Sequence, residues 1–173
     1  SELNLVSGSD HWAIAVDSAV NSAAAAFPVW SRMPVAERAV ILQTMMDVLD
    51  ARREEFYDLA AKEVGASHAW TSFTIDLAIG MLAHVVSLAP ALEDSEVVDP
   101  QTGKRSIIRR QPAGVVLGMV PWNAPIVLGV RAVAGALMCG NTVVMKGSEH
   151  CPKTHQHLVH VLNGAGLPDG VLK

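Results

Sequence analysis

A single amide side chain interrupts the most apolar part of this 173-residue chain. Asn123 lies in the stretch PWNAP (121–125), between the apolar runs GVVLGMV and IVLGVRAVAGALMCG. A buried amide without hydrogen-bond partners costs about 1–3 kcal/mol, so either the fold or a bound molecule must satisfy it. Asparagine is well suited to cap the helix that starts at residue 125, and it is equally able to donate to a ligand.

A second polar turn, KGSE (146–149), follows the apolar run NTVVM. In an open parallel sheet, ligands bind at the carboxyl ends of the strands, and both PWNAP and KGSE are expected at such ends. The glycine pattern G-x-G-x-x-G is absent between the first of these strands and its helix, so an ordinary Rossmann dinucleotide site has weak support.

Helices are expected over most of the first 90 residues. Apolar residues at helical spacing occupy 10–27, and Pro28 is expected to end that helix. Two further helical stretches are expected within 34–65, and a fourth helix over 67–89, ended by Pro90. These helices come before both polar turns.

The pattern then changes from helical spacing to alternation. Residues 93–112 alternate on either side of the turn PQTG, which predicts a two-stranded ribbon. The ribbon carries a basic run, for which a solvated or partner-facing strand is favoured over a phosphate-binding patch. The run consists of Lys104, Arg105, Arg109 and Arg110.

The last third of the chain alternates strands and helices. The short apolar run 114–120 is typical of a strand buried on both faces. A buried helix over 125–138, a second buried strand over 141–146 and a helix over 152–163 follow, before a third strand begins at VLK. This order predicts a parallel, right-handed α/β unit.

Composition excludes several classes of protein. Hydrophobic residues make up 50% of the chain and charged residues 17%, which argues against disorder. A net charge of −4 argues against a nucleic-acid or membrane-surface binder. Two cysteines and a polar, acidic start without a secretory signal favour a reducing, cytoplasmic location. The apolar stretch 113–139 is broken by prolines, Asn123 and Arg131, unlike a membrane span.

Several motifs together resemble the aldehyde dehydrogenase superfamily. They are PWN after a buried strand, GNTVVMKGSE, GLPDG and, upstream, AAAAFPVWSRMPVAERAVIL and KEVG. The segment EVGASHAW, with Arg131 downstream, looks more like the branch that oxidises aromatic aldehydes such as salicylaldehyde or vanillin. The resemblance implies an incomplete α/β fold with three parts. These are N-terminal helices of the cofactor-binding domain (1–92), an oligomerisation or bridging ribbon (93–112) and the first βαβα part of a Rossmann-like NAD-binding sheet (113–173).

The resemblance also implies a reaction. A cysteine thiolate forms a thiohemiacetal with the aldehyde, hydride passes to the nicotinamide, and a glutamate activates water to hydrolyse the thioester. Asn123 would donate its side-chain N–H to the oxyanion. NAD is expected over NADP, with Lys146 and Glu149 on the adenosine ribose; an exposed Lys–Glu pair is the structural alternative. The remaining cofactor residues implied are Met119, Val120, Pro121, Trp122 and Ser148, with core packing as the alternative for Met119 and Val120.

One helical face is expected to line the aldehyde tunnel. Ala124, Val127, Leu128 and Arg131 recur at helical spacing next to Asn123. Arg131 is expected to meet a polar ring substituent, while Trp70 from the fourth helix stacks on the ring. A buried arginine paired with an acidic neighbour is the alternative for Arg131.

The cysteines and histidines are assigned no catalytic or metal-binding role. A helix start could lower the pKa of Cys151, but the family's nucleophile and glutamate are expected beyond Lys173, so neither Cys151 nor Cys139 is expected to attack the aldehyde. His150, His155, His157 and His160 suggest a metal site, but without acidic or cysteine partners a solvated helix face is favoured and no metal is expected.

The chain is expected to be an N-terminal fragment of a longer enzyme. The parent is expected to be a homo-oligomer, a dimer or tetramer, that acts on a small aldehyde without nucleic acid or membrane partners. This chain alone is expected to be inactive. A non-catalytic nucleotide-binding or self-associating fragment is the alternative. The family often has proline after the lysine of the second turn, so Gly147 is expected to loosen that turn.

Overall fold

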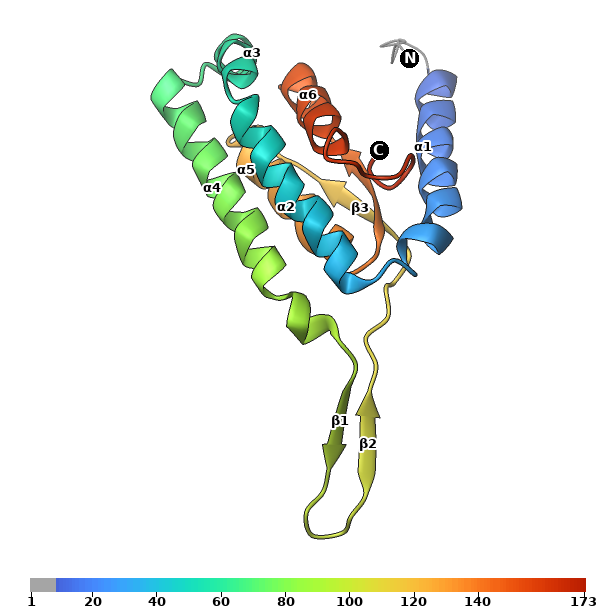
Figure 1. Cartoon of the computed structure of the whole chain (residues 1–173). Helices are drawn as coiled ribbons and strands as arrows, with labels where there is room; N and C mark the ends of the chain where they lie inside the picture. Colours follow the sequence, from blue (N-terminus) through green and yellow to red (C-terminus); the bar gives the residue numbers. More distant parts are fainter. Residues whose placement is uncertain (1–8) are drawn as a thin grey trace.

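The computed structural model describes residues 9–173, so the first eight residues of the expected helical part lie outside it. Helices and two small sheets follow one another in the order that the sequence predicts (Figure 1). The helices are α1 (Ser9–Trp30), α2 (Val35–Ala51), α3 (Glu54–Val64), α4 (His68–Ser87), the 3-10 helix η1 (Ala89–Leu92), α5 (Pro125–Met138) and α6 (Pro152–Asn163). The strands are β1 (Ser95–Val98), β2 (Arg105–Ile108), β3 (Val115–Met119) and β4 (Thr142–Lys146). The mixed α/β class is confirmed.

The first helix is longer than its proline predicts. Pro28 lies inside α1, which continues to Trp30. A proline this close to the end of a helix removes one donor without breaking the last turn, where the Ser31 N–H still donates to the Phe27 carbonyl at 2.8 Å. The expected stop at Gly65 is confirmed, because this glycine follows α3 in the left-handed conformation with φ 65°.

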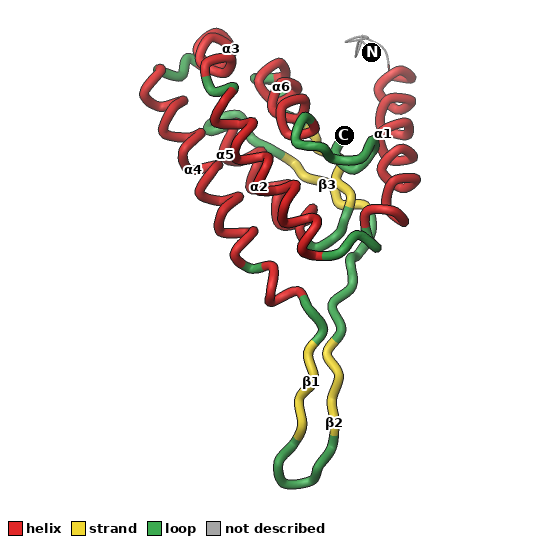
Figure 2. Tube along the Cα trace, in the orientation of Figure 1, coloured by secondary structure: helices red, strands yellow, loops and turns green. Residues whose placement is uncertain are grey.

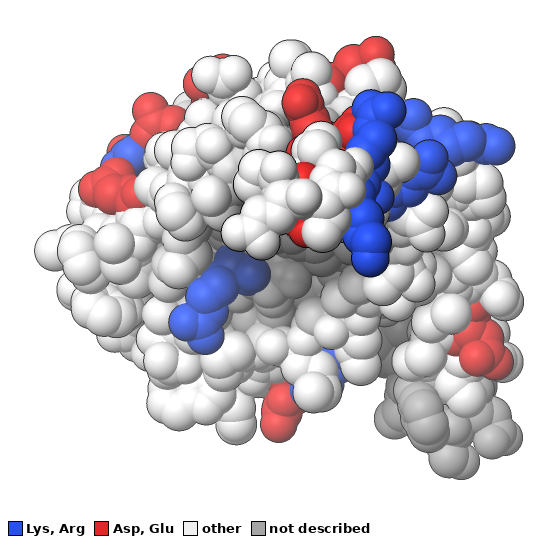
Figure 3. Space-filling view, turned by 90° about the horizontal axis from the view of Figure 1, so that it is seen from below, with Lys and Arg blue, Asp and Glu red and all other residues white. Residues whose placement is uncertain are grey.

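The predicted ribbon over 93–112 is confirmed as an antiparallel hairpin of β1 and β2. It projects away from the helical body, and every residue of its two strands is exposed (Figures 1 and 2). Its three arginines have acidic or carbonyl partners: Arg105 pairs with Glu96, Arg109 pairs with Asp94 at 3.7 Å, and Arg110 donates to the Glu93 carbonyl at 3.0 Å. Basic and acidic side chains also lie next to one another on the face seen from below (Figure 3). These pairs favour a solvated strand over a phosphate patch.

The second sheet is parallel, as predicted. β3 and β4 pair from Val115↔Thr142 to Met119↔Lys146, and a parallel bridge joins Val143 to Leu172 where the third strand was expected. The expectation that β3 is buried on both faces is wrong. Leu117 is 61% and Met119 73% exposed, because α5 covers only the face that carries Gly118.

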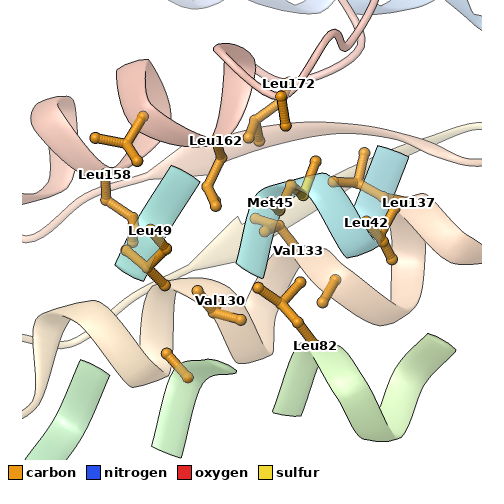
Figure 4. Close-up of a cluster of buried hydrophobic side chains, with 14 of the residues drawn as sticks. Leu42, Met45, Leu49, Leu82, Val130, Val133, Leu137, Leu158, Leu162 and Leu172 are labelled. Carbon is orange, nitrogen blue, oxygen red and sulfur yellow. The ribbon is translucent and has the colours of Figure 1, made fainter. Parts of the chain in front are cut away.

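The core lies between the helices and β4. Figure 4 shows apolar side chains of α2, α4, α5 and α6 gathered around one another. They include Leu42, Met45, Leu49, Leu82, Val130, Val133, Leu137, Leu158, Leu162 and Leu172. This cluster joins residues from the helical part and from the α/β part, so both fold around one apolar interior. The assignment of these ranges to domains of a larger enzyme stays a prediction.

Side chains from distant helices hold the end of α5. The Trp30 indole N–H donates to the Leu137 carbonyl at 3.2 Å, and Arg38 Nε donates to the Met138 carbonyl at 3.0 Å. Asn141 accepts hydrogen bonds from the backbone N–H groups that lead into β3, at 2.6 and 3.0 Å. Carbonyls at a helix end need such donors, and a cation there is favourable to the helix dipole. These contacts fix α5 relative to α1, α2 and β3.

Helix α4 has the length and apolar composition of a membrane span. Its buried residues, which include Ile75, Ala78 and Leu82, belong to the core, where α4 packs against α5 and α2. This packing identifies α4 as a core helix of the part that the structure describes, although Trp70, Phe73 and Leu77 on it are exposed.

Candidate functional site

The two polar turns lie next to each other at one edge of the parallel sheet. Met119, the last residue of β3, pairs with Lys146, the last residue of β4. The Val120 N–H extends this pairing with a hydrogen bond of 3.1 Å to the Lys146 carbonyl. Beyond the strands, the rings of Trp122 and His150 meet edge to face with centroids 5.8 Å apart. PWNAP and KGSE therefore form one continuous surface at the carboxyl ends of the strands.

The Asn123 side chain is exposed, so the expectation of a buried amide is wrong. The structural alternative is also wrong, because the N-cap residue of α5 is Ala124 and no side chain caps this helix. Asn123 makes no side-chain hydrogen bond to any of residues 13–173, the part of the chain whose side chains the structure describes. The amide thus stands beside an uncapped helix N-terminus, where donors and the positive end of the helix dipole face outward. That environment suits a group that carries negative charge.

A cavity of about 510 Å³ opens behind the second turn. Three of the expected cofactor residues line it, namely Lys146, Ser148 and Glu149. The four other expected cofactor residues do not line it: Met119, Pro121 and Trp122 are exposed and Val120 is buried at the core edge. The remaining lining residues are Met145, Gly147, Pro152, Lys153, His155, Gln156, Val159 and Lys173.

Lys146 and Glu149 form the surface pair that was the structural alternative. Lys146 Nζ lies 3.5 Å from Glu149 Oε2, and both side chains are largely exposed. A hydrogen bond from its own backbone N–H, followed by the charge of Lys146, lowers the pKa of Glu149. Such an exposed pair contributes little stability, so both groups remain able to bind a ligand. The rim of the cavity thus offers a carboxylate acceptor and an ammonium donor next to each other.

The expected substrate face is split between the core and the surface. Ala124 and Val127 are buried, Leu128 is half-buried and Arg131 is exposed. No acidic residue among residues 13–173 pairs with Arg131, and its side chain is exposed, so the alternative of a buried, paired arginine is wrong. Trp70 is 46% exposed on α4, which packs beside α5. Neither the 510 Å³ cavity nor a second cavity of about 580 Å³, which Arg38 and Cys139 help to line, is lined by Trp70 or Arg131.

Sequence reasoning missed one wall of the cavity. Pro152, His155, Gln156 and Val159 of α6 line it. They recur at spacings of three, four and seven residues from Pro152, which places them on one helical face. This spacing was visible in the sequence, but the burial of the neighbouring Leu158 and Leu162 is what shows which face is turned inward.

The expectation that the four histidines lie on one solvated helix face is wrong. His155 is 3% exposed and His157 is partly buried, whereas His150 and His160 are exposed. His157 lies 3.0 Å from Glu55 of α3 and 4.8 Å, between ring centroids, from Phe56. Among residues 13–173, whose side chains the structure describes, no three His, Cys, Asp or Glu side chains gather as a metal site would require.

The helix start does not lower the pKa of Cys151, and the expectation that this thiol is not the nucleophile stays a prediction. Cys151 is fully buried, and burial, with smaller contributions from the charges of Glu63 and Glu149, raises the pKa of its thiol to about 11. Cys139 is exposed, but it follows the far end of α5. A helix of 14 residues is roughly 20 Å long, which separates Cys139 from Asn123. Neither thiol is placed to attack a carbonyl held by Asn123.

Comparison with known proteins gives one consistent picture. A family model, "Aldehyde dehydrogenase family", matches residues 5–173. Vanillin dehydrogenase of Pseudomonas sp. (strain HR199 / DSM 7063) is 46% identical over 156 residues, covering 90% of this chain and 32% of that protein. The chain therefore spans about a third of the length of this relative.

Solved structures of aldehyde dehydrogenases and of an NADP-dependent enzyme are also similar to this chain. Salicylaldehyde dehydrogenase from Pseudomonas putida G7, complexed with salicylaldehyde, has a TM-score of 0.86 at 36% identity, covering 92% of this chain and 33% of that one. An NAD-dependent benzaldehyde dehydrogenase from Corynebacterium glutamicum has a TM-score of 0.82 at 32% identity, and the match covers 91% of this chain and 34% of that one. An NADP-dependent enzyme from E. coli has a TM-score of 0.85 at 27% identity, and the match covers 92% of this chain and 33% of that one.

The two thiols are expected to differ in reactivity. With iodoacetamide at about pH 8, native protein should be alkylated at exposed Cys139 and spared at Cys151, because a pKa of about 11 leaves roughly a hundredfold less thiolate than an ordinary thiol has. Peptide mass spectrometry measures both sites, and urea-unfolded protein, in which both should react, is the control. Equal native rates would contradict the burial of Cys151.

Proposed function

The chain belongs to the aldehyde dehydrogenase family, and we propose that it supplies the oxyanion donor and part of the cofactor site of an enzyme that oxidises an aromatic aldehyde to the carboxylic acid with NAD. The observation that carries the proposal is the pairing of Met119 with Lys146. This register brings the exposed amide of Asn123 and the polar rim of the cavity to one edge of the sheet. Since the chain spans about a third of the length of its relatives, the activity is proposed for the longer enzyme.

Asn123 is the proposed donor to the reacting carbonyl. Its exposed N–H groups and the uncapped N-terminus of α5 stabilise the negative charge that develops on the carbonyl oxygen as a nucleophile adds. The cysteine nucleophile is proposed to come from outside these 173 residues, because Cys151 is buried with a raised pKa and Cys139 lies a helix length away. The glutamate that activates water is placed outside them by the family resemblance alone. The chain by itself is then inactive in aldehyde oxidation.

Lys146, Ser148 and Glu149 are the proposed cofactor residues. The Glu149 carboxylate accepts hydrogen bonds from the adenosine ribose hydroxyls, and Lys146 holds it at the cavity rim. When bound, the nicotinamide accepts the hydride of the aldehyde carbon. A carboxylate at the ribose disfavours a 2′-phosphate by like-charge repulsion, which Lys146 partly offsets. The preference for NAD is therefore proposed to be about tenfold to a few hundredfold, given screening by solvent.

The aromatic substrate is proposed from the relatives and from two side chains. The similar proteins include enzymes named for vanillin, salicylaldehyde and benzaldehyde. Trp70 and Arg131 are exposed on the adjacent helices α4 and α5. An indole can stack on an aromatic ring, and an unpaired guanidinium can donate to a ring hydroxyl.

The exposed hairpin favours self-association of the longer enzyme. Val97, Val98, Ile107 and Ile108 are apolar and between 45% and 63% exposed on β1 and β2. The outer strand edges carry unpaired backbone groups that another chain can bind. We assign this hairpin to a homo-oligomer contact. A non-catalytic, self-associating chain is the second candidate function, which the same exposure supports.

Replacement of Asn123 tests the oxyanion role. In the full-length enzyme, Asn123→Ala should lower kcat by about 10²–10³ because one transition-state donor is lost, while the NAD Kd changes little. Steady-state kinetics and cofactor titration measure the two effects. Asn21→Ala, an exposed asparagine on α1, is the matched control and should leave kcat unchanged. A weakened NAD Kd with normal kcat would assign Asn123 to the nucleotide cleft instead.

Replacement of Glu149 tests the cofactor assignment. Glu149→Ser in the full-length enzyme should raise kcat/KM with NADP and lower it with NAD, since the negative charge at the ribose is removed. The readout is the ratio of the two values. Glu54→Ser, at an exposed position of α3, should leave that ratio unchanged. If Glu149→Ser leaves the NADP-to-NAD ratio of kcat/KM unchanged, Glu149 is a surface residue with no role in cofactor choice.

Replacement of Arg131 tests the substrate class. Arg131→Leu in the full-length enzyme should lower kcat/KM by about tenfold for hydroxylated benzaldehydes, because a charged hydrogen bond to the ring substituent is lost. The loss for aliphatic aldehydes should be less than about twofold, since these offer no such acceptor. The aliphatic substrates thus serve as the control within one variant. Equal losses on both classes would indicate a structural role.

A further inference from the structure

The backbone of the second turn is held from behind by a buried histidine. The Ser148 N–H donates to Nδ1 of His155 at 3.0 Å, and the two residues are 6% and 3% exposed. The turn is closed further where the His150 N–H donates to Ser148 Oγ at 3.2 Å. A backbone donor that is buried in this way needs an acceptor, and His155 is the acceptor that the structure provides. The proposed cofactor residues Lys146 and Glu149 lie on either side of this contact.

Gly147 gives the histidine ring its room. A Cβ at this position would lie 3.1 Å from both Cβ and Nδ1 of His155. The ring therefore occupies the space that a side chain at residue 147 would fill. Gly147 was expected to loosen the turn. The His155 ring and its hydrogen bond to Ser148 instead restrain the backbone that the glycine would leave free.

The helix that carries His155 is itself anchored to α3. The Glu63 carboxylate accepts hydrogen bonds from the Lys153 N–H at 2.9 Å, the Thr154 N–H at 2.8 Å and Thr154 Oγ1 at 2.6 Å. A carboxylate at these otherwise unpaired donors caps the helix and is favourable to its dipole. The first turn of α6, and with it His155, is thereby fixed relative to the helical body.

We propose that His155 is a positioning residue that holds the turn 146–149 in the shape that binds the adenosine half of the cofactor. This inference rests on the proposed function. His155 touches the turn rather than the cofactor's reacting atoms, so it acts through Ser148 and its neighbours. The contact works only while Nδ1 is unprotonated, since a protonated ring has N–H groups on both nitrogens and accepts no hydrogen bond.

The surroundings of His155 keep the ring neutral. Burial lowers its pKa, against smaller opposing effects of a backbone hydrogen bond with Pro125 and of the charge of Glu63. The Lys146 ammonium also lowers it, and the Cys151 thiol lies 3.5 Å from Nδ1. With a depressed pKa, the neutral ring prevails at neutral pH and is lost only as the pH falls below the ordinary histidine range, about 6.5.

Two substitutions of nearly equal shape separate the hydrogen bond from the packing. In the full-length enzyme, His155→Asn places an amide oxygen close to the position of Nδ1, whereas His155→Leu has the same branching and no acceptor. His155→Leu should raise the NAD Kd, measured by calorimetry, about five- to fiftyfold because the Ser148 N–H is left unsatisfied. His155→Asn should stay within about threefold of wild type, and kcat at saturating NAD should fall by less than about threefold in both.

The pH dependence gives a second measurement that does not need the leucine variant. Between about pH 7 and 5, the NAD affinity of wild type should fall more steeply than that of His155→Asn, whose amide does not titrate. Glu63, Lys146 and Glu149, the charged groups near the ring, are present in both proteins, so the two profiles are compared at a single changed side chain. His160→Leu, at an exposed position of the same helix, should leave the affinity and its pH profile unchanged.

Three results would overturn the inference. They are wild-type affinity in His155→Leu, equal losses in the leucine and asparagine variants, and parallel pH profiles of wild type and His155→Asn. Failure of wild type to bind NAD or NADP would instead overturn the proposed function. The contact can then be judged alone by hydrogen exchange of the Ser148 amide, which should be at least about fivefold faster in His155→Leu than in His155→Asn; equal exchange would overturn it.

Discussion

The parallel register of β3 and β4 is the constraint on which the site depends. It places the end of each strand beside the other, at Met119 and Lys146. A slip by one residue would move the two turns about 3.3 Å apart and reverse the faces of the strand. Gly118 helps to prevent this, because a Cβ there would lie 3.3 Å from the Cβ of Ala132 on α5. Helix and strand thus approach closely only in this register.

Helix α5, which packs against β3 and begins two residues after Asn123, sets the position of this residue relative to the strands. Its C-terminal carbonyls are satisfied by Trp30 and Arg38, from two different helices. Its N-terminus has no side-chain cap. The helix is therefore secured at the end remote from the site and left polar at the end beside Asn123. This asymmetry leaves donors available where the proposed reaction develops negative charge.

The second turn is secured by a different route. Glu63 fixes the start of α6, and His155 on α6 holds the Ser148 backbone. A proline would stiffen such a turn by restricting its own backbone. Here a glycine and a buried ring achieve restraint through tertiary contact, which ties the turn to α3 and α6. Stiffness that depends on tertiary contact is lost when the contact is lost, whereas that of a proline is built into the chain.

Local patterns in the sequence determined the elements and the place of the polar turns. Proline at the first position and the apolar spacing gave α5 (Pro125–Met138) and α6 (Pro152–Asn163) with their observed bounds, and the strand–turn order placed PWNAP and KGSE at strand ends. Burial was decided only by the tertiary structure. Asn123 is exposed and His155 buried, the reverse of what their neighbours suggested. The reason is that burial depends on elements far away in the chain: the carboxylate that caps α6 belongs to a residue 91 positions before Thr154, and no local pattern contains that distance.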